Sequence, residues 1–414
     1  MNDKTDHITT VSSDGANVSN LRSQIGPLIL LTAIFFVNFS ARIVYAPLMP
    51  VIEAELGILH AEAGSLFFLI SMGYFIALLC SGWFAARLNH RNTIILSSVA
   101  LGLALLSTAL SENLWAIRFT LLLTGAAAGL YLPSGIAVLM SIIRQDQLGK
   151  AIAIHELAPS LALVVVPLLS EFILTWFHWR TTLVLIAVSG ICFCWVFTRF
   201  KLIGAFEGAP PNLEALKTFL KEPPFWLMVL LFGLGITGSF GLYTMLPLYL
   251  VTDHGFDRNY ANTLVSFSRV SGLFMTFVGG WAADRFGSGR TMIIVFFLTG
   301  ISTVAMGITN GTGILFAVFM QPMVAVCFFP AGFKQLSRIG PPGTRNIVVS
   351  LTVPAAFLIG AGAVPTLIGF LGDSASFATG YILVGCLVTF GALAAWFLDS
   401  LMKRNVFPDT LKDH

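Results

Sequence analysis

Twelve long apolar runs recur along this chain of 414 residues, and they constrain its fold more than any other feature of the sequence. At a rise of 1.5 Å per helical residue, each run is long enough to cross the ~30 Å hydrocarbon core of a bilayer. Because lipid offers no partners to backbone polar groups, we expect an all-α membrane protein with twelve transmembrane helices. The runs cover residues 26–50, 62–85, 93–111, 114–141, 147–175, 181–200, 224–251, 259–283, 290–309, 312–337, 345–371 and 376–398.

The composition of the chain agrees with a membrane location. Of its residues, 56% are hydrophobic and only 10% are charged, whereas a soluble protein carries about 25% charged residues. The first 24 residues are polar and lack the apolar core and cleavage site of a signal peptide. They are predicted to form a disordered cytoplasmic tail.

The sequence contains no pattern that predicts enzyme chemistry or a cofactor. The five cysteines lie inside apolar runs, where thiols act as small packing residues, so neither a disulfide framework nor a metal cluster is expected. The stretch "HELAP" at residues 155–159 lacks the second histidine of a zinc-protease motif, because Pro159 stands at that position. No nucleophile elbow, phosphate-binding loop or Cys-x-x-Cys motif occurs.

The distribution of lysine and arginine predicts the orientation of the chain in the membrane. The tails and the loops after the second, fourth, sixth, eighth and tenth runs hold 18 of the 23 basic residues, and the opposite loops hold only Arg180 and Arg258. Positive charge accumulates on the cytoplasmic side, so both termini are predicted to be cytoplasmic in a multi-pass protein of the cell inner membrane. The net charge of +3 reflects this topology, and no nucleic-acid partner is expected.

An internal repeat divides the chain into two parts. Gly82 and Gly280, Trp83 and Trp281, Arg87 and Arg285, and Pro167 and Pro365 are each 198 residues apart. The predicted domains are a tail at 1–24, a six-helix half at 25–200, a cytoplasmic linker at 201–222, a second six-helix half at 223–400 and a tail at 401–414.

Two related loops carry a resemblance to a known family. "GWFAARLNHR" follows the second run and "GWAADRFGSGR" follows the eighth. Both resemble the signature loop of the major facilitator superfamily, roughly Gly-x-x-x-Asp-Arg-x-Gly-x-[Arg/Lys], and "GAAAGLYLPSG" at residues 125–135 also resembles that family. The first copy has Ala86 in place of the Asp and Asn89 in place of the Gly. The gating residues implied by the resemblance are Gly82, Arg87, Arg91, Gly280, Asp284, Arg285, Gly287 and Arg290.

The resemblance implies a secondary transporter that rocks its two halves around a site near the bilayer midplane. It also implies a gate at the signature loops. Asp284 is expected to pair with the start of the fifth helix, near Gly149, and so to favour one conformational state. Ala86 is unable to make the corresponding contact.

Three segments place charged residues deep in the predicted bilayer, where each costs ~2.5–3.5 kcal/mol. Arg42 lies ~22 Å along the first helix, on a face with Asn38 and Tyr45. Arg269 lies ~15 Å deep in the eighth helix, on a face with Asn262 and Ser266. The pair His155–Glu156 lies ~15 Å into the fifth helix.

Two deep arginines and one deep acid leave at least one guanidinium without a counter-charge, so an anion is the expected substrate. The forked guanidinium donors match a carboxylate bidentately, and the resemblance extends to the monocarboxylate and sugar-acid symporters of the superfamily. The 36 phenylalanines favour an organic anion with some apolar body over an inorganic ion. The predicted substrate-binding residues are Arg42, Arg269, Asn38, Tyr45, Ser266, Tyr131, Tyr243 and Gln321, with Arg118 as a secondary candidate; Glu156 and His155 are predicted to couple protons.

Several alternatives remain open at this point. In one alternative, the Arg42 side chain extends toward the outer headgroups. In another, Arg269 is a structural partner of Glu156. The chain is alternatively an exporter or antiporter of drugs or metabolites, an anion uniporter or exchanger, or a sensor that does not transport. The expected partners are a small anionic substrate, protons and the lipid bilayer, and the protein is expected to be a monomer.

Overall fold

The computed structural model describes residues 21, 24–209, 222–339 and 345–406, and of residues 345–347 and 403–406 it describes the backbone alone. The predicted tails at 1–24 and 401–414 and the linker at 201–222 therefore lie largely outside the described residues. Every regular element in the described part of the chain is a helix.

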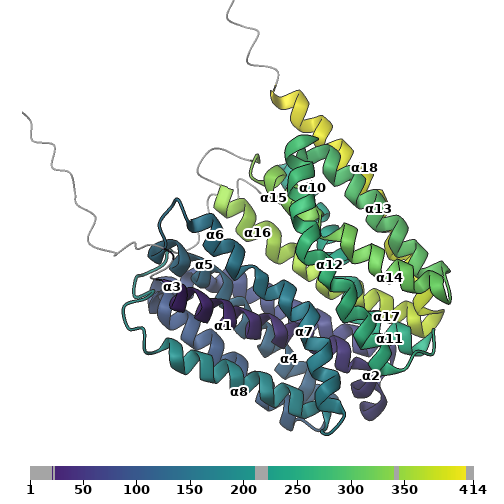
Figure 1. The fold of residues 1–414 in the computed structure, drawn as a ribbon, viewed down its shortest axis with the longest axis horizontal. Helices are drawn as coiled ribbons and strands as arrows, with labels where there is room; N and C mark the ends of the chain where they lie inside the picture. The colour runs from purple at the N-terminus through teal and green to yellow at the C-terminus, as the bar shows by residue number, and fades with distance from the viewer. Residues whose placement is uncertain (1–20, 22–23, 210–221, 340–344, 407–414) are drawn as a thin grey trace, which may run out of the picture.

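The helices form two groups that are consecutive in the sequence (Figure 1). The N-terminal group comprises α1 (Ile25–Ile43), α2 (Tyr45–Leu56), α3 (His60–Leu110), α4 (Leu114–Gly129), α5 (Tyr131–Ile142), α6 (Leu148–His155), α7 (Leu157–Leu174) and α8 (Trp179–Phe197). The C-terminal group comprises α10 (Pro223–Ile236), η1 (Thr237–Gly241), α11 (Leu242–Thr252), α12 (Arg258–Arg285), α13 (Ser288–Ile308), α14 (Thr312–Ala325), α15 (Phe328–Leu336), α16 (Arg345–Phe357), η2 (Leu358–Ala363), α17 (Val364–Ser374) and α18 (Phe377–Val406).

Prolines explain why several predicted transmembrane runs appear as two helices in line. A proline has no backbone N–H and its ring clashes with the preceding turn, so the helix is interrupted upstream of it. The interruptions lie three residues before a proline in each of four places. They fall at Val44 before Pro47, Leu130 before Pro133, Glu156 before Pro159, and Cys327 before Pro330.

Ten helical stretches of the described residues are long and apolar enough to cross a membrane. The sequence predicts twelve, and the difference has two sources. Residues 60–110 form one stretch of 51 residues, in which two predicted spans are joined through a kink at Asn89. Helix α12 has 28 residues but carries Arg269 and other polar groups along its length, so it is less apolar than the ten stretches. Large hydrophobic side chains that face outward, among them Leu103, Phe274 and Phe390, supply a surface suited to lipid.

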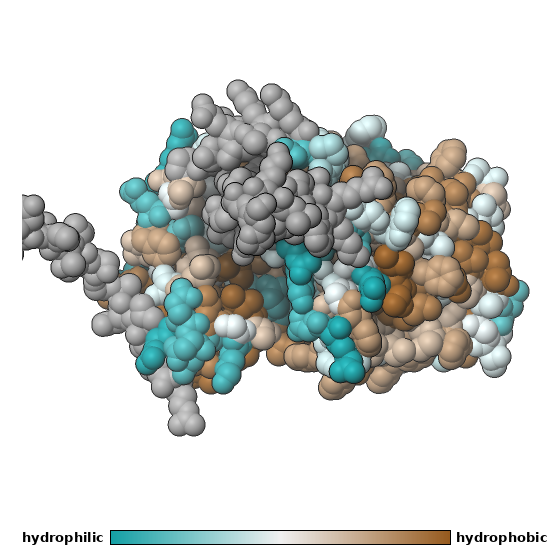
Figure 2. All heavy atoms as spheres, turned by 90° about the horizontal axis from the view of Figure 1, so that it is seen from above, coloured by the Kyte–Doolittle hydropathy of each residue, from teal (hydrophilic) through white to brown (hydrophobic). Residues whose placement is uncertain are grey.

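The two groups touch at one end and separate toward the other. In Figure 1 they meet around α2, α7, α11 and α17, and they diverge toward α6, α15 and α16. The basic signature loops lie at the diverging end. Seen from above the view of Figure 1, hydrophilic side chains gather at the left and near the centre, and hydrophobic ones occupy much of the right side (Figure 2).

The kink in α3 depends on an unusual backbone conformation at Asn89. This residue has φ 66° and ψ 166°, and it is the only non-glycine residue with positive φ in the described chain. Its side-chain oxygen accepts a hydrogen bond from the Asn92 amide at 2.9 Å, which caps the helical segment that follows. Gly287, which stands 198 residues later in the second signature loop, has φ 90°. The two loops therefore share a backbone turn, although only the second has the glycine that suits it.

This comparison predicts that Asn89→Gly raises the free energy of unfolding by about 1 kcal/mol. Glycine relieves a conformation that costs other residues about 1–3 kcal/mol. As a helix cap, glycine stabilises the protein only about a few tenths of a kcal/mol less than asparagine does. Asn89→Ala keeps the strain and loses the cap, so it should be about 1 kcal/mol less stable than the unmodified protein. Thermal unfolding in detergent micelles measures both changes. Asn113→Gly is the matched control, because Asn113 caps α4 through Ala116 with φ −121° and gains no relief. Lower stability of Asn89→Gly than of the unmodified protein would contradict this account.

Candidate functional site

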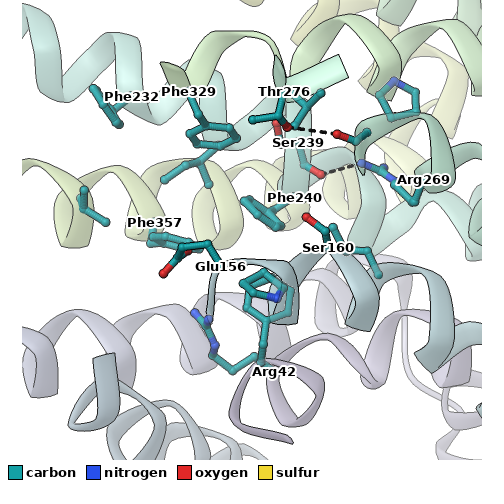
Figure 3. Close-up of a pocket in the computed structure, with 18 of the residues that line it drawn as sticks. Arg42, Glu156, Ser160, Phe232, Ser239, Phe240, Arg269, Thr276, Phe329 and Phe357 are labelled. Atoms are coloured by element: carbon teal, nitrogen blue, oxygen red, sulfur yellow. Dashed lines mark hydrogen bonds between the residues drawn. The ribbon is translucent and has the colours of Figure 1, made fainter. Parts of the chain in front are cut away.

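A cavity of about 420 Å³ lies between the two groups of helices. Its walls come from α1, α3, α5 and α7 on one side and from α10, η1, α12, α14, α15 and α16 on the other. Arg42, Arg269 and Glu156 all line it. In the view of Figure 3 the two arginines lie on opposite sides of Phe240. The cavity therefore brings together the three segments in which the sequence places deep charge.

Arg42 projects from the last turn of α1 into a set of aromatic rings. Its guanidinium carbon lies 4.2 Å from the ring centre of Tyr74, 4.8 Å from that of Phe39 and 5.4 Å from that of Phe357. Ring faces attract cations, so these contacts offset part of the cost of burial. The Nε atom is buried and has no hydrogen-bond partner. The aromatic rings therefore cover the guanidinium, and none of these contacts supplies a negative charge.

Arg269 is held by the backbone of the π-helical segment η1. Its Nη1 donates a hydrogen bond to the Ser239 carbonyl at 2.8 Å, and its guanidinium carbon lies 5.0 Å from the ring centre of Tyr243. A π-helical turn changes the register of the backbone bonds and frees carbonyls for such contacts, which is one reason these turns occur at functional sites. The Nε atom of Arg269 is buried without a partner.

Neither arginine forms an ion pair within the described part of the chain. The carboxylates that lie within 4.0 Å of a basic group there are paired with other residues. Glu156 has His155 as its partner, so the alternative of a structural Arg269–Glu156 pair does not apply to this conformation. Two buried cations therefore face one cavity without an ion-pair partner among the described residues.

Glu156 stands at the break between α6 and α7 that Pro159 imposes. Its side chain is about half exposed and lines the cavity, whereas His155 is fully buried behind it. The His155 ring stacks on Phe35 with centres 4.5 Å apart. Its Nδ1 lies 3.3 Å from Glu156 Oε1, and its Nε2 lies 3.1 Å from the hydroxyl of Tyr131. Of the two neighbouring residues, only Glu156 reaches the cavity.

The rest of the cavity wall is mainly aromatic. Seven phenylalanines line it, namely Phe35 and Phe39 from α1 and Phe232, Phe240, Phe329, Phe333 and Phe357 from the C-terminal group. The hydroxyl groups in the lining are those of Tyr74, Ser160, Ser239 and Thr276. Most of these residues are not among those predicted from the sequence. The 198-residue repeat makes Phe240 the counterpart of Arg42, so the sequence does contain a signal for Phe240. No pattern in the sequence identifies Tyr74 or Ser160.

Three of the predicted substrate-binding residues are positioned away from the main cavity by hydrogen bonds to the backbone. Asn38 donates to the Ala128 carbonyl at 3.2 Å, which turns it toward α4. Tyr131 donates to the Leu31 carbonyl at 2.7 Å and lies against the buried His155, outside the cavity lining. Gln321 donates to the Gly238 carbonyl at 2.7 Å, so it supports η1 from behind.

Three further predicted residues occupy other surroundings. Tyr45 is buried in the core of the N-terminal group, and its hydroxyl has no hydrogen-bond partner. Tyr243 lies beside Arg269 and lines a second cavity of about 40 Å³, which Arg42 also lines. Ser266 donates a hydrogen bond to the Val164 carbonyl and so joins α12 to α7. Depth in the helix does not by itself fix which way a side chain points.

The secondary candidate Arg118 has a structural partner. Its Nη2 lies 2.9 Å from Glu62 Oε1, and its guanidinium covers the ring of Trp115. It does not line the cavity. The sequence did not predict this pairing, because Glu62 is 56 residues away along the chain.

The signature loops lie at the diverging end and bind within their own groups. Arg91 donates to the carbonyls of Thr198 at 2.9 Å and Phe200 at 3.3 Å, which satisfies the end of α8. Asp284 pairs with Lys334 of α15 at 2.6 Å. The expected partner near Gly149 belongs to the other group, and at this end the two groups lie apart. Gly82 and Gly280 are partly buried, and Arg87, Arg285 and Arg290 are exposed.

Polar contacts close the opposite end between the two groups. Buried Glu171 of α7 accepts hydrogen bonds from Arg258 Nε at 2.9 Å and from Asn262 Nδ2 at 2.6 Å. Asn262 also donates to the Pro47 carbonyl at 3.0 Å. The carboxylate of Asp373, at the end of α17, accepts hydrogen bonds from the first backbone amides of α3 at 3.0 and 2.8 Å. A helix N-terminus favours an anion, so this contact also joins the groups.

The comparisons with known proteins agree with this architecture. A family model described as Major Facilitator Superfamily matches residues 31–352 and 250–411 of the chain. The D-galactonate transporter of Escherichia coli O6:H1 (strain CFT073) is 23% identical over 402 residues, which cover 85% of this chain and 90% of that relative. The probable L-galactonate transporter of Escherichia coli K12 is 23% identical over 423 residues, which cover 95% of this chain and 92% of that relative.

A solved structure shares the fold at lower identity. It is a bacterial homolog of the human lysosomal transporter Spinster, in an inward-facing and occupied conformation. The TM-score is 0.77 at 15% identity, and the match covers 94% of this chain and 99% of that one.

The contacts around Glu171 predict that Glu171→Gln loosens the closed end. The change removes a carboxylate that accepts charge-assisted bonds worth about 1.5–3 kcal/mol each, so the population open at this end should rise about tenfold or more. Spin labels at Trp176 and Tyr260, in a background whose five cysteines are replaced, would report the distance between the groups. Asp146→Asn is the matched control, because Arg144 and Asp146 form an exposed pair inside one group. An unchanged distance distribution in Glu171→Gln would refute the gating role of this contact.

Proposed function

This chain belongs to the Major Facilitator Superfamily, and from that premise we propose that it moves a small organic anion of the carboxylate type across the cytoplasmic membrane by alternating access, as proton symport. The observation that carries the proposal is the pair of buried arginines, one from each group of helices, that face one cavity without an ion-pair partner among the described residues. The family and the transporters among its relatives identify a transport protein and not an enzyme.

The proposed architecture has twelve transmembrane helices in two pseudo-symmetric halves, 25–200 and 223–400. The ten assigned stretches support this number if the 51-residue stretch is counted as two spans and α12 is added. The bias of basic residues supports cytoplasmic termini, tails and linker. With that orientation the diverging end faces the cytoplasm and the Glu171 contacts close the outside. Each chain encloses its own cavity, which favours a monomer.

The anion is proposed to bind to Arg42 and Arg269. A carboxylate accepts two parallel hydrogen bonds from the edge of a guanidinium, and both arginines line the cavity. Because the two arginines come from different groups of helices, a ligand that contacts both gains most when the groups approach each other. Binding would then favour closure of the open end, as alternating access requires.

Hydrogen-bond geometry supports a proton site at His155 and Glu156. The Tyr131 hydroxyl lies 2.7 Å from the Leu31 carbonyl, which only accepts, so the hydroxyl proton is used there. The contact of 3.1 Å between Tyr131 and His155 then requires an Nε2–H donor. If the ring is neutral, its other nitrogen, Nδ1, carries a lone pair that faces Glu156 Oε1 at 3.3 Å. This contact is favourable only if a proton lies between the two atoms. The pair is therefore suited to hold one exchangeable proton at the cavity wall.

Anion and proton binding support each other in this scheme without direct contact. The charged and titratable groups around Glu156 are the adjacent His155, Tyr131 behind it, Tyr74 and Arg42 on the same wall of the cavity, and Arg269 on the opposite wall. An anion bound at Arg42 and Arg269 brings negative charge into the cavity that Glu156 lines, and a proton taken up with it offsets that charge, so anion and proton binding favour each other by linkage.

The first test replaces each arginine with lysine, which keeps the charge and loses the fork. A thermal-shift screen of the purified protein against carboxylates, sulfonates and phosphates first identifies the ligands that stabilise it. Arg42→Lys and Arg269→Lys should each weaken the binding of the best carboxylate at least tenfold. Arg118→Lys is the control and should bind normally, because Arg118 lies outside the cavity. Equal affinity in all three variants would reject the arginine site.

The second test concerns coupling and uses Glu156→Gln in proteoliposomes. The variant should exchange substrate across the membrane but should no longer accumulate it under an imposed inward proton gradient, because the amide carries no exchangeable proton. Glu112→Gln, at an exposed loop position, should accumulate substrate normally. Full proton-driven uptake by Glu156→Gln would exclude Glu156 as the carrier. Uptake by the unmodified protein that ignores the gradient would instead indicate a uniporter or an exchanger.

A further inference from the structure

We infer that the substrate is a monocarboxylate with a flat aromatic body, and that polyhydroxylated acids are poor ligands of this cavity. This inference rests on the proposed function and names the substrate class of the same site. It is argued from the side chains that would contact the body of the anion, not from those that bind its charge.

Phe240 is the centre of a continuous aromatic wall next to Arg42. Its ring centre lies 5.5 Å from that of Phe39 at 61°, 5.7 Å from that of Phe357 at 31° and 6.2 Å from that of Phe329 at 52°. Aromatic rings attract one another at centre separations of 4.5–7 Å in tilted, edge-on or offset arrangements. An aryl group in the cavity would add to this set at the same spacings. Because Phe39 and Phe357 also contact Arg42, such a ring would lie within reach of the guanidinium.

The two π-helical segments hold this wall in place. Phe240 lies in η1, and Phe357 is the residue immediately before η2. The segments pack so closely that a Cβ atom on Gly241 would lie 2.1 Å from the Gly360 carbonyl oxygen. Side chains other than glycine do not fit there. The rings are therefore carried by backbone with little freedom, and a rigid wall favours a rigid planar ligand.

The polar groups of the cavity are too few for a polyol. Besides the charged residues and Tyr74, the hydroxyl-bearing lining residues are Ser160, Ser239 and Thr276, and Thr276 already donates to the Gly272 carbonyl at 3.0 Å. Each ligand hydroxyl that loses water without gaining a partner weakens binding. A sugar acid carries several hydroxyls along its length, whereas an aryl group carries none and gains from burial against phenylalanine.

This inference separates the chain from the relatives to which it is similar. Two of them are named for galactonate, a polyhydroxylated carboxylate. At 23% identity the lining of the cavity is free to differ while the fold is kept. The shared feature on this view is the recognition of the carboxylate, and the difference is the body attached to it.

The experiment compares benzoate with gluconate, which carry the same charge and differ in the body. Affinities are measured by thermal shift and by isothermal titration on the purified protein. Benzoate is expected to bind at least tenfold more tightly than gluconate, and more tightly than cyclohexanecarboxylate, which is apolar but not planar. Phe240→Leu should weaken benzoate binding about tenfold and leave gluconate binding unchanged. Phe390→Leu is the control, because Phe390 is exposed on α18 outside the cavity.

The outcomes distinguish this inference from the proposed function. If gluconate binds as tightly as benzoate or more tightly, and if Arg42→Lys or Arg269→Lys abolishes that binding, the aromatic substrate class is wrong and the anion site stands. If neither ligand binds, or if benzoate binding survives in the Arg42→Lys, Arg269→Lys double variant, both ideas fail. Benzoate binding that is equally weak in Phe240→Leu and Phe390→Leu also overturns the aromatic wall.

Discussion

Burying a guanidinium away from water costs several kcal/mol unless its neighbours compensate, and this chain buries two, Arg42 and Arg269. The fold compensates each in a different way. Three rings cover Arg42, and a carbonyl freed by a π-helical turn holds Arg269. Neither solution supplies a negative charge, so part of the cost remains. The cavity between the two groups of helices reduces the remaining free-energy cost of burying these guanidinium groups. Solvent reduces it when the cavity is open, and an anion does so in the proposed mechanism.

The need to satisfy backbone hydrogen bonds explains where the site is built. Pro47, Pro159 and Pro330 interrupt helices at the depth of the cavity, and each interruption leaves carbonyls and side chains that an unbroken helix would not present. Glu156 stands at one such break. In the C-terminal group the corresponding irregular segments are η1 and η2. Irregular backbone at membrane depth is tolerated because it faces a cavity and not lipid.

The sequence predicts the helical membrane fold and the deep charges, because each follows from a large free-energy term that composition and spacing express directly. The family is recognised from the resemblance of the two signature loops. The sequence predicts poorly in which direction a side chain points around its helix axis. Asn38 and Ser266 share a face with an arginine in the sequence, yet each turns to a carbonyl of a neighbouring helix. Such contacts depend on which helices pack together, and periodicity does not contain this information. The Asp284–Lys334 pair differs from the expected one for a related reason, since a moving gate has more than one set of partners.

The balance between open and closed states follows from the size of the contacts at the two ends. The closed end includes polar contacts between the two groups, of which Glu171 with Arg258 and Asn262 is the most buried. Contacts of this kind are worth a few kcal/mol in total, and a ligand shifts an equilibrium by its difference in affinity for the two states. In the proposed mechanism, an anion that joins Arg42 to Arg269 supplies a difference of the same order. Close packing of α3 on α17 also holds this end, since a Cβ atom on Gly64 would lie 2.5 Å from the Pro365 carbonyl oxygen. The polar contacts are therefore the part of this interface that a single change of charge can weaken.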